Sequence, residues 1–218
     1  MSNECVEAVV CGLGPKVDET IVSICNNGEV PLALLEYSDR VIALDNDDKE
    51  LKYTFEMIAH LINGRYDHFL DELLISENRE YFSANGRLDC IRERIDLLQI
   101  LKGDIFRDLP DNFAKVYLSN ALTYAGGSTV GVTEGLSLIA QSLPPNGLAY
   151  ISDGHKVFPP YLVSHEISPQ LCVCEDLTIR AREKESFWSP VVFQKKILDP
   201  RERGGIIGGL SLYSLQLN

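Results

Sequence analysis

The sequence predicts an α/β fold with a mostly parallel seven-stranded sheet and an antiparallel hairpin at its C-terminal end. Short apolar, β-branched runs such as TIVSIC and RVIAL alternate with segments of helical periodicity. These runs are continuously apolar, as in parallel strands that are covered on both faces. Two β-rich runs near the C-terminus are joined only by the charged turn REKES, which is too short for a parallel crossover.

The chain has 218 residues, which is enough for one sizeable core. We expect an N-terminal cover segment at 1–19, a main ligand-binding domain at 20–198 and a C-terminal extension at 199–218. Residues 63–96 exceed the usual length of a connection between two elements. We therefore expect them to form a helical insertion near the ligand edge of the sheet.

The first half of the chain contains three predicted strands: TIVSIC, RVIAL and QILK. EVPLALLEY is predicted as a helix with Pro31 in its first turn, where the missing N–H is harmless. DKELKYTFEMIAHLI places Leu51, Phe55, Ile58 and Ile62 on one helical stripe, which we expect to face the sheet. Shorter helices are predicted at ECVEAVVCGL, DHFLDELL and RLDCIRERIDLL.

The second half continues the alternation. AKVYLS is a predicted strand, TEGLSLIAQSL a helix and LAYIS a fifth strand, so consecutive strands are expected to be connected by right-handed crossovers. QLCVCEDLTIRA and FWSPVVFQKKI are then predicted as the two antiparallel strands of the terminal hairpin.

The amino-acid composition limits the kinds of partner and metal that we expect the chain to bind. The chain has 20 Lys and Arg against 32 Asp and Glu, a formal charge of −12 that repels nucleic acid and anionic membranes at long range. No apolar run is long enough to span a bilayer and no secretory leader is visible, so we expect a cytoplasmic protein without stable membrane insertion. The six cysteines are interpreted as reduced packing residues. The histidines are scattered, and no metal site is predicted.

Polar residues follow four of the predicted strands. In an open α/β sheet, ligands bind outside the carboxyl ends of the strands, so these residues are candidate ligand contacts. They are Asn26, Asn27 and Gly28 after the first strand, Asp45 and Asn46 after the second, Asp104 and Ile105 after the third, and Ser119 and Asn120 after the fourth.

The acids suggest a nucleoside ligand. Asp45 lies 17 positions after Gly28, close to the spacing at which an acid binds both ribose hydroxyls. A helix-capping role is the alternative for Asp45. Asp104 is placed to accept from an adenine amino group, with Ile105 beside the base, and a turn aspartate is its alternative role.

The loop after the first strand lacks the GxGxxG pattern of dinucleotide binders, because only Gly28 is present. Glu29 at the helix start would oppose a pyrophosphate but tolerate an ammonium group. The side-chain amides of Asn26 and Asn27 could bind a carboxylate. A ligand with adenosine at one end and an amino acid at the other fits this loop best.

These features together resemble the Rossmann-like class I SAM-dependent methyltransferase fold over about Thr20 to Leu198, which implies S-adenosyl-L-methionine (SAM) as cofactor. A narrower resemblance covers Ser23 to Leu74. There the chain is similar to bacterial SAM:diacylglycerol 3-amino-3-carboxypropyltransferases of betaine-lipid synthesis, through the strand, the turn ending in Gly28, the acid Asp45, Leu51–Lys52 and the later SNAL. This resemblance implies cofactor contacts at Gly28 and Asp45, and places Ser119 and Asn120 near the reacting centre.

Several functions remain open at this point. We expect alkyl transfer from SAM to a small, non-nucleic-acid acceptor, with methyl transfer slightly favoured over aminocarboxypropyl transfer. An NAD-dependent oxidoreductase and a non-catalytic SAM-binding protein are more distant alternatives. Tyr124 and His155 are the candidate catalytic residues in the acceptor pocket, with His155 as a general base. A surface loop position is the alternative for His155.

Overall fold

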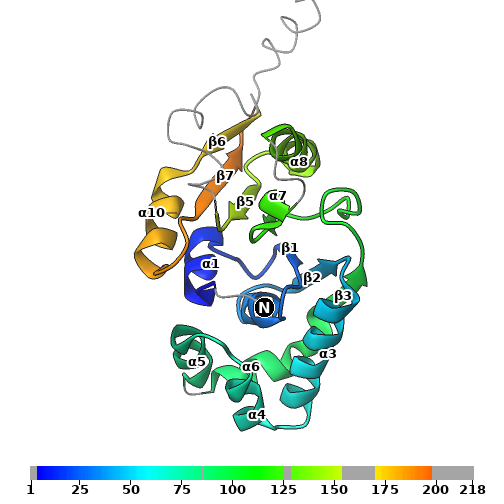
Figure 1. The fold of residues 1–218 in the computed structure, drawn as a ribbon, viewed down its shortest axis with the longest axis vertical. Helices are drawn as coiled ribbons and strands as arrows, with labels where there is room; N and C mark the ends of the chain where they lie inside the picture. The colour runs from blue at the N-terminus through cyan, green and yellow to red at the C-terminus, as the bar shows by residue number, and fades with distance from the viewer. Residues whose placement is uncertain (1–3, 85, 125–128, 154–169, 198–218) are drawn as a thin grey trace, which may run out of the picture.

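The computed structural model describes residues 4–84, 86–124, 129–153 and 170–197, and they form a mixed α/β sheet structure (Figure 1). The seven strands of the sheet lie in the order β3-β2-β1-β4-β5-β7-β6. β1 to β5 pair in parallel, and β7 is antiparallel to both β5 and β6. The predicted fold class is therefore confirmed. The strands are β1 (Thr20–Ile24), β2 (Arg40–Asp45), β3 (Leu98–Lys102), β4 (Lys115–Tyr117), β5 (Leu148–Ile151), β6 (Leu171–Val173) and β7 (Val191–Lys195).

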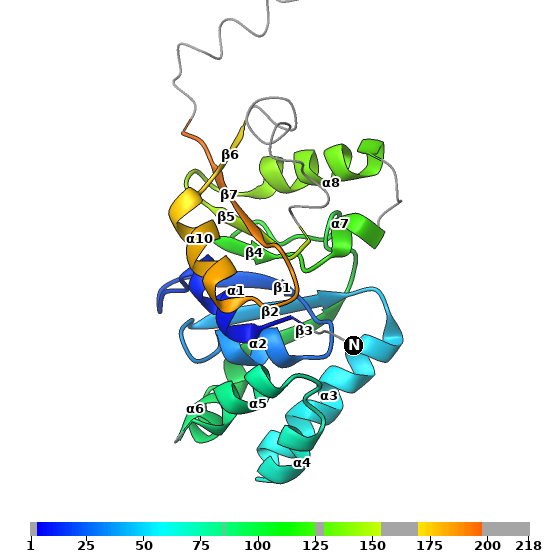
Figure 2. The same cartoon turned by 60° about the vertical axis from the view of Figure 1, so that its left-hand side comes forward.

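Helices cover both faces of this sheet, as the apolar strands require (Figure 2). Neighbouring residues of a strand point to opposite faces, so Ile21 and Tyr117 belong to one buried cluster while Val22 and Val116 belong to another. The helices are α1 (Val6–Leu13), α2 (Glu29–Leu34), α3 (Asp48–Ile62), α4 (Tyr66–Asp71), α5 (Ser76–Ser83), α6 (Arg87–Glu93), the 3-10 helix η1 (Ile95–Leu97), α7 (Ala121–Tyr124), α8 (Thr129–Ser142) and α10 (Glu175–Lys184).

The N-terminal helix α1 is part of the core. Val6, Val9 and Leu13 are fully buried in the same cluster as Tyr117 and Tyr150 of the sheet. α1 lies beside α10, and the two helices cover this end of the sheet together (Figure 2). The helix ends at Gly14, whose φ of 51° gives the left-handed conformation common after a helix C-terminus.

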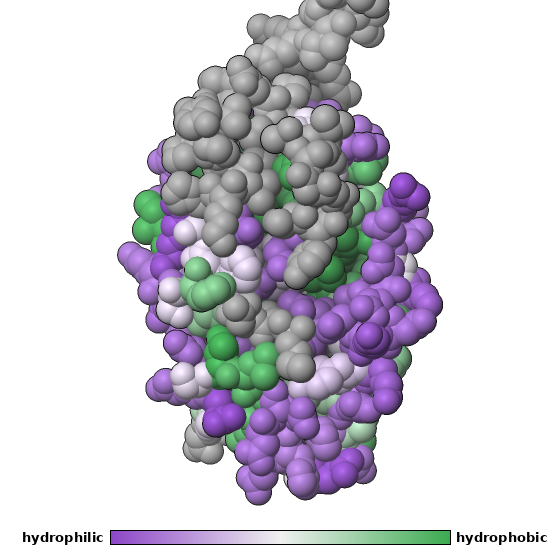
Figure 3. Space-filling view, in the orientation of Figure 1, coloured by the Kyte–Doolittle hydropathy of each residue, from purple (hydrophilic) through white to green (hydrophobic). Residues whose placement is uncertain are grey.

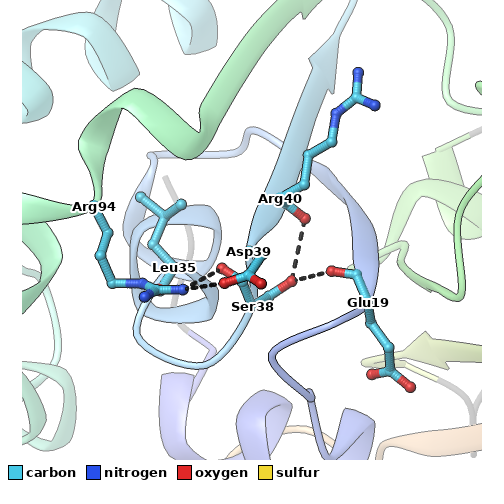
Figure 4. Close-up of polar contacts among 6 residues, drawn as sticks. All are labelled: Glu19, Leu35, Ser38, Asp39, Arg40 and Arg94. Atoms are coloured by element: carbon cyan, nitrogen blue, oxygen red, sulfur yellow. Dashed lines mark hydrogen bonds and ion pairs between the residues drawn. The ribbon is translucent and has the colours of Figure 1, made fainter.

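The insertion between β2 and β3 consists of α4, α5, α6 and η1. Arg94 at its end donates to the carbonyl oxygen of Ser38 and to the carboxylate of Asp39, each at 3.0 Å (Figure 4). The hydroxyl of Ser38 in turn donates to the carbonyl oxygens of Glu19 and Arg40. Glu19 directly precedes β1, and Arg40 is the first residue of β2. The insertion is thereby joined to the amino edge of β1 and β2.

The predicted contact stripe of α3 is wrong in part. Leu51 is buried, but Phe55 and Ile62 are 55% and 53% exposed. Thr54 and Met57 are among the residues buried in their place. The physical reason is the close approach of the helix to the loop after β1, because a Cβ placed on Gly28 would lie 3.3 Å from the Cα of Thr54. The α3 residue that faces Gly28 must therefore be small. Thr54 meets this need, and its inward position sets the rotation of α3.

The terminal hairpin pairs as predicted, but its first strand is shorter than expected. β6 ends at Val173, and EDLTIRAREK forms α10 instead of continuing the strand. Glu175 and Asp176 lie in the first turn of α10, and Arg182 and Lys184 lie in its last, which suits the helix dipole. The charged turn REKES is therefore largely the end of a helix.

Candidate functional site

Asp45 connects the carboxyl ends of β1 and β2. Its Oδ2 accepts the backbone N–H of Asn26 at 3.3 Å, and its Oδ1 accepts that of Asp47 at 3.0 Å. The side chain is buried, and this desolvation raises the pKa of its carboxyl. The two N–H groups fix the orientation of the carboxylate, and each oxygen keeps a further lone pair for a ligand hydroxyl.

The helix-capping role proposed as an alternative for Asp45 belongs to Asp47. Asp47 is the N-cap of α3, and its Oδ1 accepts the backbone N–H of Lys49 at 2.8 Å. Asn46, between the two acids, is exposed. Asp45 is thus free of the capping role that competed with ligand binding.

The loop after β1 closes around its own side chains. Gly28 has a φ of 85° and begins α2, a conformation that favours glycine. The amide of Asn27 donates to the carboxylate of Glu29, and both side chains are buried. Asn78 of α5 donates to the other oxygen of Glu29. The loop therefore leaves the backbone and the half-buried Asn26 as its more accessible groups, while the Asn27 amide is engaged internally.

Burial dominates the electrostatics of Glu29. It raises the pKa of the carboxyl to about 7, against the opposing effect of the hydrogen bonds from Asn78 and Asn27. One N–H of the Asn27 amide is thus engaged with Glu29, and an amide carries two. The contact of Asn27 and Glu29 with an amino-acid tail stays a prediction.

Asp104 follows β3 and organises its own turn. Its Oδ1 accepts the backbone N–H of Phe106 at 2.9 Å, so the turn role is present. Its Oδ2 lies 3.8 Å from the guanidinium of the exposed Arg107. Ile105 is buried in the core cluster that also contains Leu44. The remaining lone pairs of Asp104 leave room to accept a hydrogen bond from an adenine amino group.

Ser119 and Asn120 follow β4, and they lie beside a residue that the sequence did not single out. The hydroxyl of Ser119 donates to Oε1 of Glu4, and the phenol of Tyr117 donates to Oε2. Glu4 and Ser119 are each 2% exposed. The carbonyl of Ser119 accepts the N–H of Ser152 at 2.9 Å, which joins the ends of β4 and β5.

Glu4 is the functional candidate that sequence reasoning missed. Burial raises the pKa of its carboxyl to about 7, although the hydrogen bond from Ser119 acts in the opposite direction. Asn78 donates to the backbone carbonyl of Glu4 at 2.9 Å, so one amide reaches both Glu4 and Glu29. A single acid before a short helix carries no periodic signal, and its partners lie more than 70 positions away.

The two candidate catalytic residues, Tyr124 and His155, stay predictions. Tyr124 ends α7, but only its place in the helix is described. His155 lies outside the described residues.

Within the described ranges, no group of three or more His, Cys, Asp or Glu side chains could hold a metal ion. No helix among these residues is long and apolar enough to cross a membrane.

Solved structures provide the comparison with known proteins. No protein-family model and no curated protein matches the chain. The N-methyltransferase NodS from Bradyrhizobium japonicum, in complex with S-adenosylhomocysteine, matches at 10% identity and a TM-score of 0.53, over 86% of this chain and 83% of that one. An RNA methyltransferase from Salinibacter ruber, also with S-adenosylhomocysteine, matches at 10% identity and 0.51, over 89% and 92%. The chain covers only 50% of YcgJ from Bacillus subtilis, at a TM-score of 0.44.

These likenesses concern the fold, because the identities are low. This chain has the strand order β3-β2-β1-β4-β5-β7-β6 with an antiparallel final strand pair, and its match covers 83% of NodS and 92% of the RNA methyltransferase. The candidate residues lie at the carboxyl edge of β1 to β4, where open α/β sheets bind ligands. The chain has the Rossmann-like fold of the class I SAM-dependent methyltransferases.

Proposed function

We propose that the protein binds SAM at the carboxyl edge of β1 to β4 and transfers its methyl group to a small acceptor. The observation that carries the proposal is the position of Asp45. It stands at the end of β2 with its carboxylate oriented by two backbone N–H groups and freed of the capping role by Asp47. Both hydroxyls of a ribose would donate hydrogen bonds to this carboxylate.

The remaining contacts follow from the neighbouring strand ends. Asp104 and Ile105 would bind the adenine, and Asn26, Gly28 and the loop backbone would lie nearest the amino-acid tail. Ser119 and Asn120 would border the reacting centre. SAM supplies a sulfonium-activated carbon, so the protein's task is to align a nucleophile with one C–S bond.

A small acceptor is favoured over nucleic acid by the charge around the site. The start of α3 exposes Asp47 and Asp48, and Asp108 is exposed after β3. The surface over α3 is largely hydrophilic (Figure 3). Lys102 pairs with Asp48 at this edge, but the chain as a whole has a formal charge of −12, which would repel a phosphate backbone at long range. Structural neighbours from Salinibacter ruber and Clostridium thermocellum have names that refer to the methylation of RNA and rRNA, so an RNA acceptor belongs among the substrates to be tested.

The test is to identify the nucleoside product. The protein would be incubated with SAM and a panel of small amines, hydroxyl compounds and RNA, after calorimetry has established SAM binding. S-adenosylhomocysteine is the expected product. Methylthioadenosine would instead identify aminocarboxypropyl transfer, the reaction implied by the resemblance of Ser23–Leu74 to the 3-amino-3-carboxypropyltransferases. Binding of NAD without binding of SAM would overturn the proposal, and SAM binding without either product would indicate a non-catalytic protein.

A further inference from the structure

The buried carboxyl of Glu4 is joined to the end of β4 by two hydroxyl groups. Tyr117 donates to its Oε2 and Ser119 to its Oε1. Ser119 has a φ of 51°, a left-handed conformation that costs a non-glycine residue about 1–2 kcal/mol. Such strain is characteristic of functional sites, where the surrounding structure holds a side chain in one direction. Here it holds the Ser119 hydroxyl beside Glu4.

A path of polar groups leads from this carboxyl towards the surface. The Ser119 hydroxyl also points towards Oδ1 of the half-buried Asn120, an acceptor 3.3 Å away that carries no proton itself. Glu4 is therefore inside, Asn120 is at the outer end, and Ser119 stands between them. The lone pairs of the Ser119 oxygen can receive a proton directly from a bound acceptor on this outer side, while the hydroxyl releases its own proton to Glu4.

We propose that Glu4 accepts the proton that the acceptor loses during transfer, and that Ser119 relays it. This inference rests on the proposed function. The nucleophilic atom of the acceptor bonds to the transferred carbon, and the C–S bond breaks with its electron pair left on sulfur. The acceptor's proton passes to Oγ of Ser119 as the Ser119 proton passes to Oε1 of Glu4. The sulfonium and carboxylate charges are both lost, so charge balances.

The surroundings of Glu4 suit a group that changes protonation near neutral pH. Burial raises the pKa of its carboxyl to about 7, and a general base is most effective when its pKa lies near the working pH. Two other carboxylates, Glu185 and Glu29, raise the same pKa by repulsion. The titratable and hydroxyl groups that face Glu4 are Tyr117 from β4, Tyr150 from β5, Ser119 and Ser152 after these strands, Glu29 from α2 and Glu185 after α10.

The first test compares Glu4→Gln with Glu7→Gln, which removes a half-exposed acid from the neighbouring helix α1. The assay is single-turnover release of the nucleoside from SAM with the fastest acceptor of the panel. For Glu4→Gln we expect a rate loss of about 100-fold and disappearance of the rate increase that the parent shows between about pH 6 and pH 8. Glu7→Gln keeps both. Glu4→Asp restores the pH dependence with part of the rate.

The second test needs no turnover. Infrared difference spectroscopy follows the carbonyl band of protonated carboxyls as the pH is changed, and Glu4→Gln and Glu29→Gln identify which band belongs to which residue. We expect the Glu4 band to titrate near pH 7 in the parent protein. Ser119→Ala should move this titration to higher pH, because it removes a hydrogen bond that lowers the pKa of Glu4.

The outcomes separate the two proposals. If calorimetry detects no SAM binding, the proposed function fails and the proton path fails with it. If SAM binds and turns over but Glu4→Gln retains the parent's pH dependence, the path alone is wrong. The path is also wrong if the infrared band of Glu4 shows no titration near neutral pH.

Discussion

Asn78 donates its side-chain amide to the carboxylate of Glu29, 49 positions earlier in the chain. The same amide group donates to the carbonyl of Glu4 at 2.9 Å, and its oxygen accepts the N–H of Val6 at 2.8 Å. One side chain of the insertion therefore supplies hydrogen-bond partners to both the N-terminal segment and the start of α2. Each of these partners is buried, so none can turn to water if the amide is removed.

Asn78→Ala is expected to lower the free energy of unfolding by about 3 kcal/mol, because it leaves several buried polar groups without their partner. Asn63→Ala is the matched control. The Asn63 amide donates to a single carbonyl at the exposed end of α3, so its loss should cost less than about 1 kcal/mol. Urea unfolding followed by circular dichroism measures both. Equal losses would contradict the bridging role of Asn78.

Asp45→Asn should weaken SAM binding about 10- to 100-fold, because hydrogen bonds to a charged group contribute about 1.5–3 kcal/mol. Isothermal titration calorimetry measures the change. Asp39→Asn is the control, since Asp39 pairs with Arg94 through a side chain that is half exposed at the opposite edge of the sheet. Unchanged affinity in Asp45→Asn would remove the ribose contact from the proposed function.

Gly28→Ala should destabilise the fold by about 2 kcal/mol, and Gly86→Ala by about 1 kcal/mol. Both glycines have a positive φ, 85° and 76°, so both replacements introduce backbone strain. Only at Gly28 does the new Cβ also meet Thr54, at 3.3 Å, whereas it meets nothing within 4 Å at Gly86. The difference between the two unfolding free energies isolates that contact. SAM affinity should fall in Gly28→Ala alone.

Stability should fall as the pH rises from about 4.5 to about 7. The folded-state pKa values of Glu4 and Glu29 are raised from 4.5 to about 7, so in this window the folded chain holds protons that the unfolded chain has lost. Their contribution is fully present below pH 4.5 and is lost through pH 7, at roughly 3 kcal/mol for each carboxyl.

Glu4→Gln should reduce this pH dependence, since its amide does not titrate. Glu7→Gln, which removes a half-exposed acid from α1, should retain it. Urea unfolding across the same pH range provides the measurement. A slope of equal steepness in the parent and in Glu4→Gln would show that Glu4 ionises in the native state like an exposed glutamate.

The sequence was sufficient for the sheet because its strands are apolar runs separated by helical periods. It failed where a choice depended on a distant contact. The faces of α3 are an example: Phe55 fits the hydrophobic stripe as well as its neighbours, but the approach of Gly28 decides that Thr54 faces inwards. α10 is another, because CEDLTIRA is compatible with either a strand or a helix over so short a length.

The candidate site likewise contains residues that the sequence predicts and residues whose role depends on distant contacts. Asp45 could be found because a parallel strand places its last residue at a known edge. Glu4 could not, because nothing local marks a single acid that will be buried against Tyr117 and Ser119. The engagement of Asn27 with Glu29 was also hidden, since it depends on Asn78 from the insertion. Spacing along the chain identifies edges of the sheet, whereas side-chain networks need the assembled structure.

The packing of α1 against α10 has a consequence for synthesis on the ribosome. The apolar side of α1 is completed by residues such as Ala181, which emerge more than 160 positions later. At a translation rate of about 5–20 residues per second, Val6 and Val9 stay uncovered for roughly ten seconds or longer. During that interval the nascent chain offers a short hydrophobic helix to chaperones, and the sheet is completed later still, when β7, which follows α10 in the chain, pairs between β5 and β6.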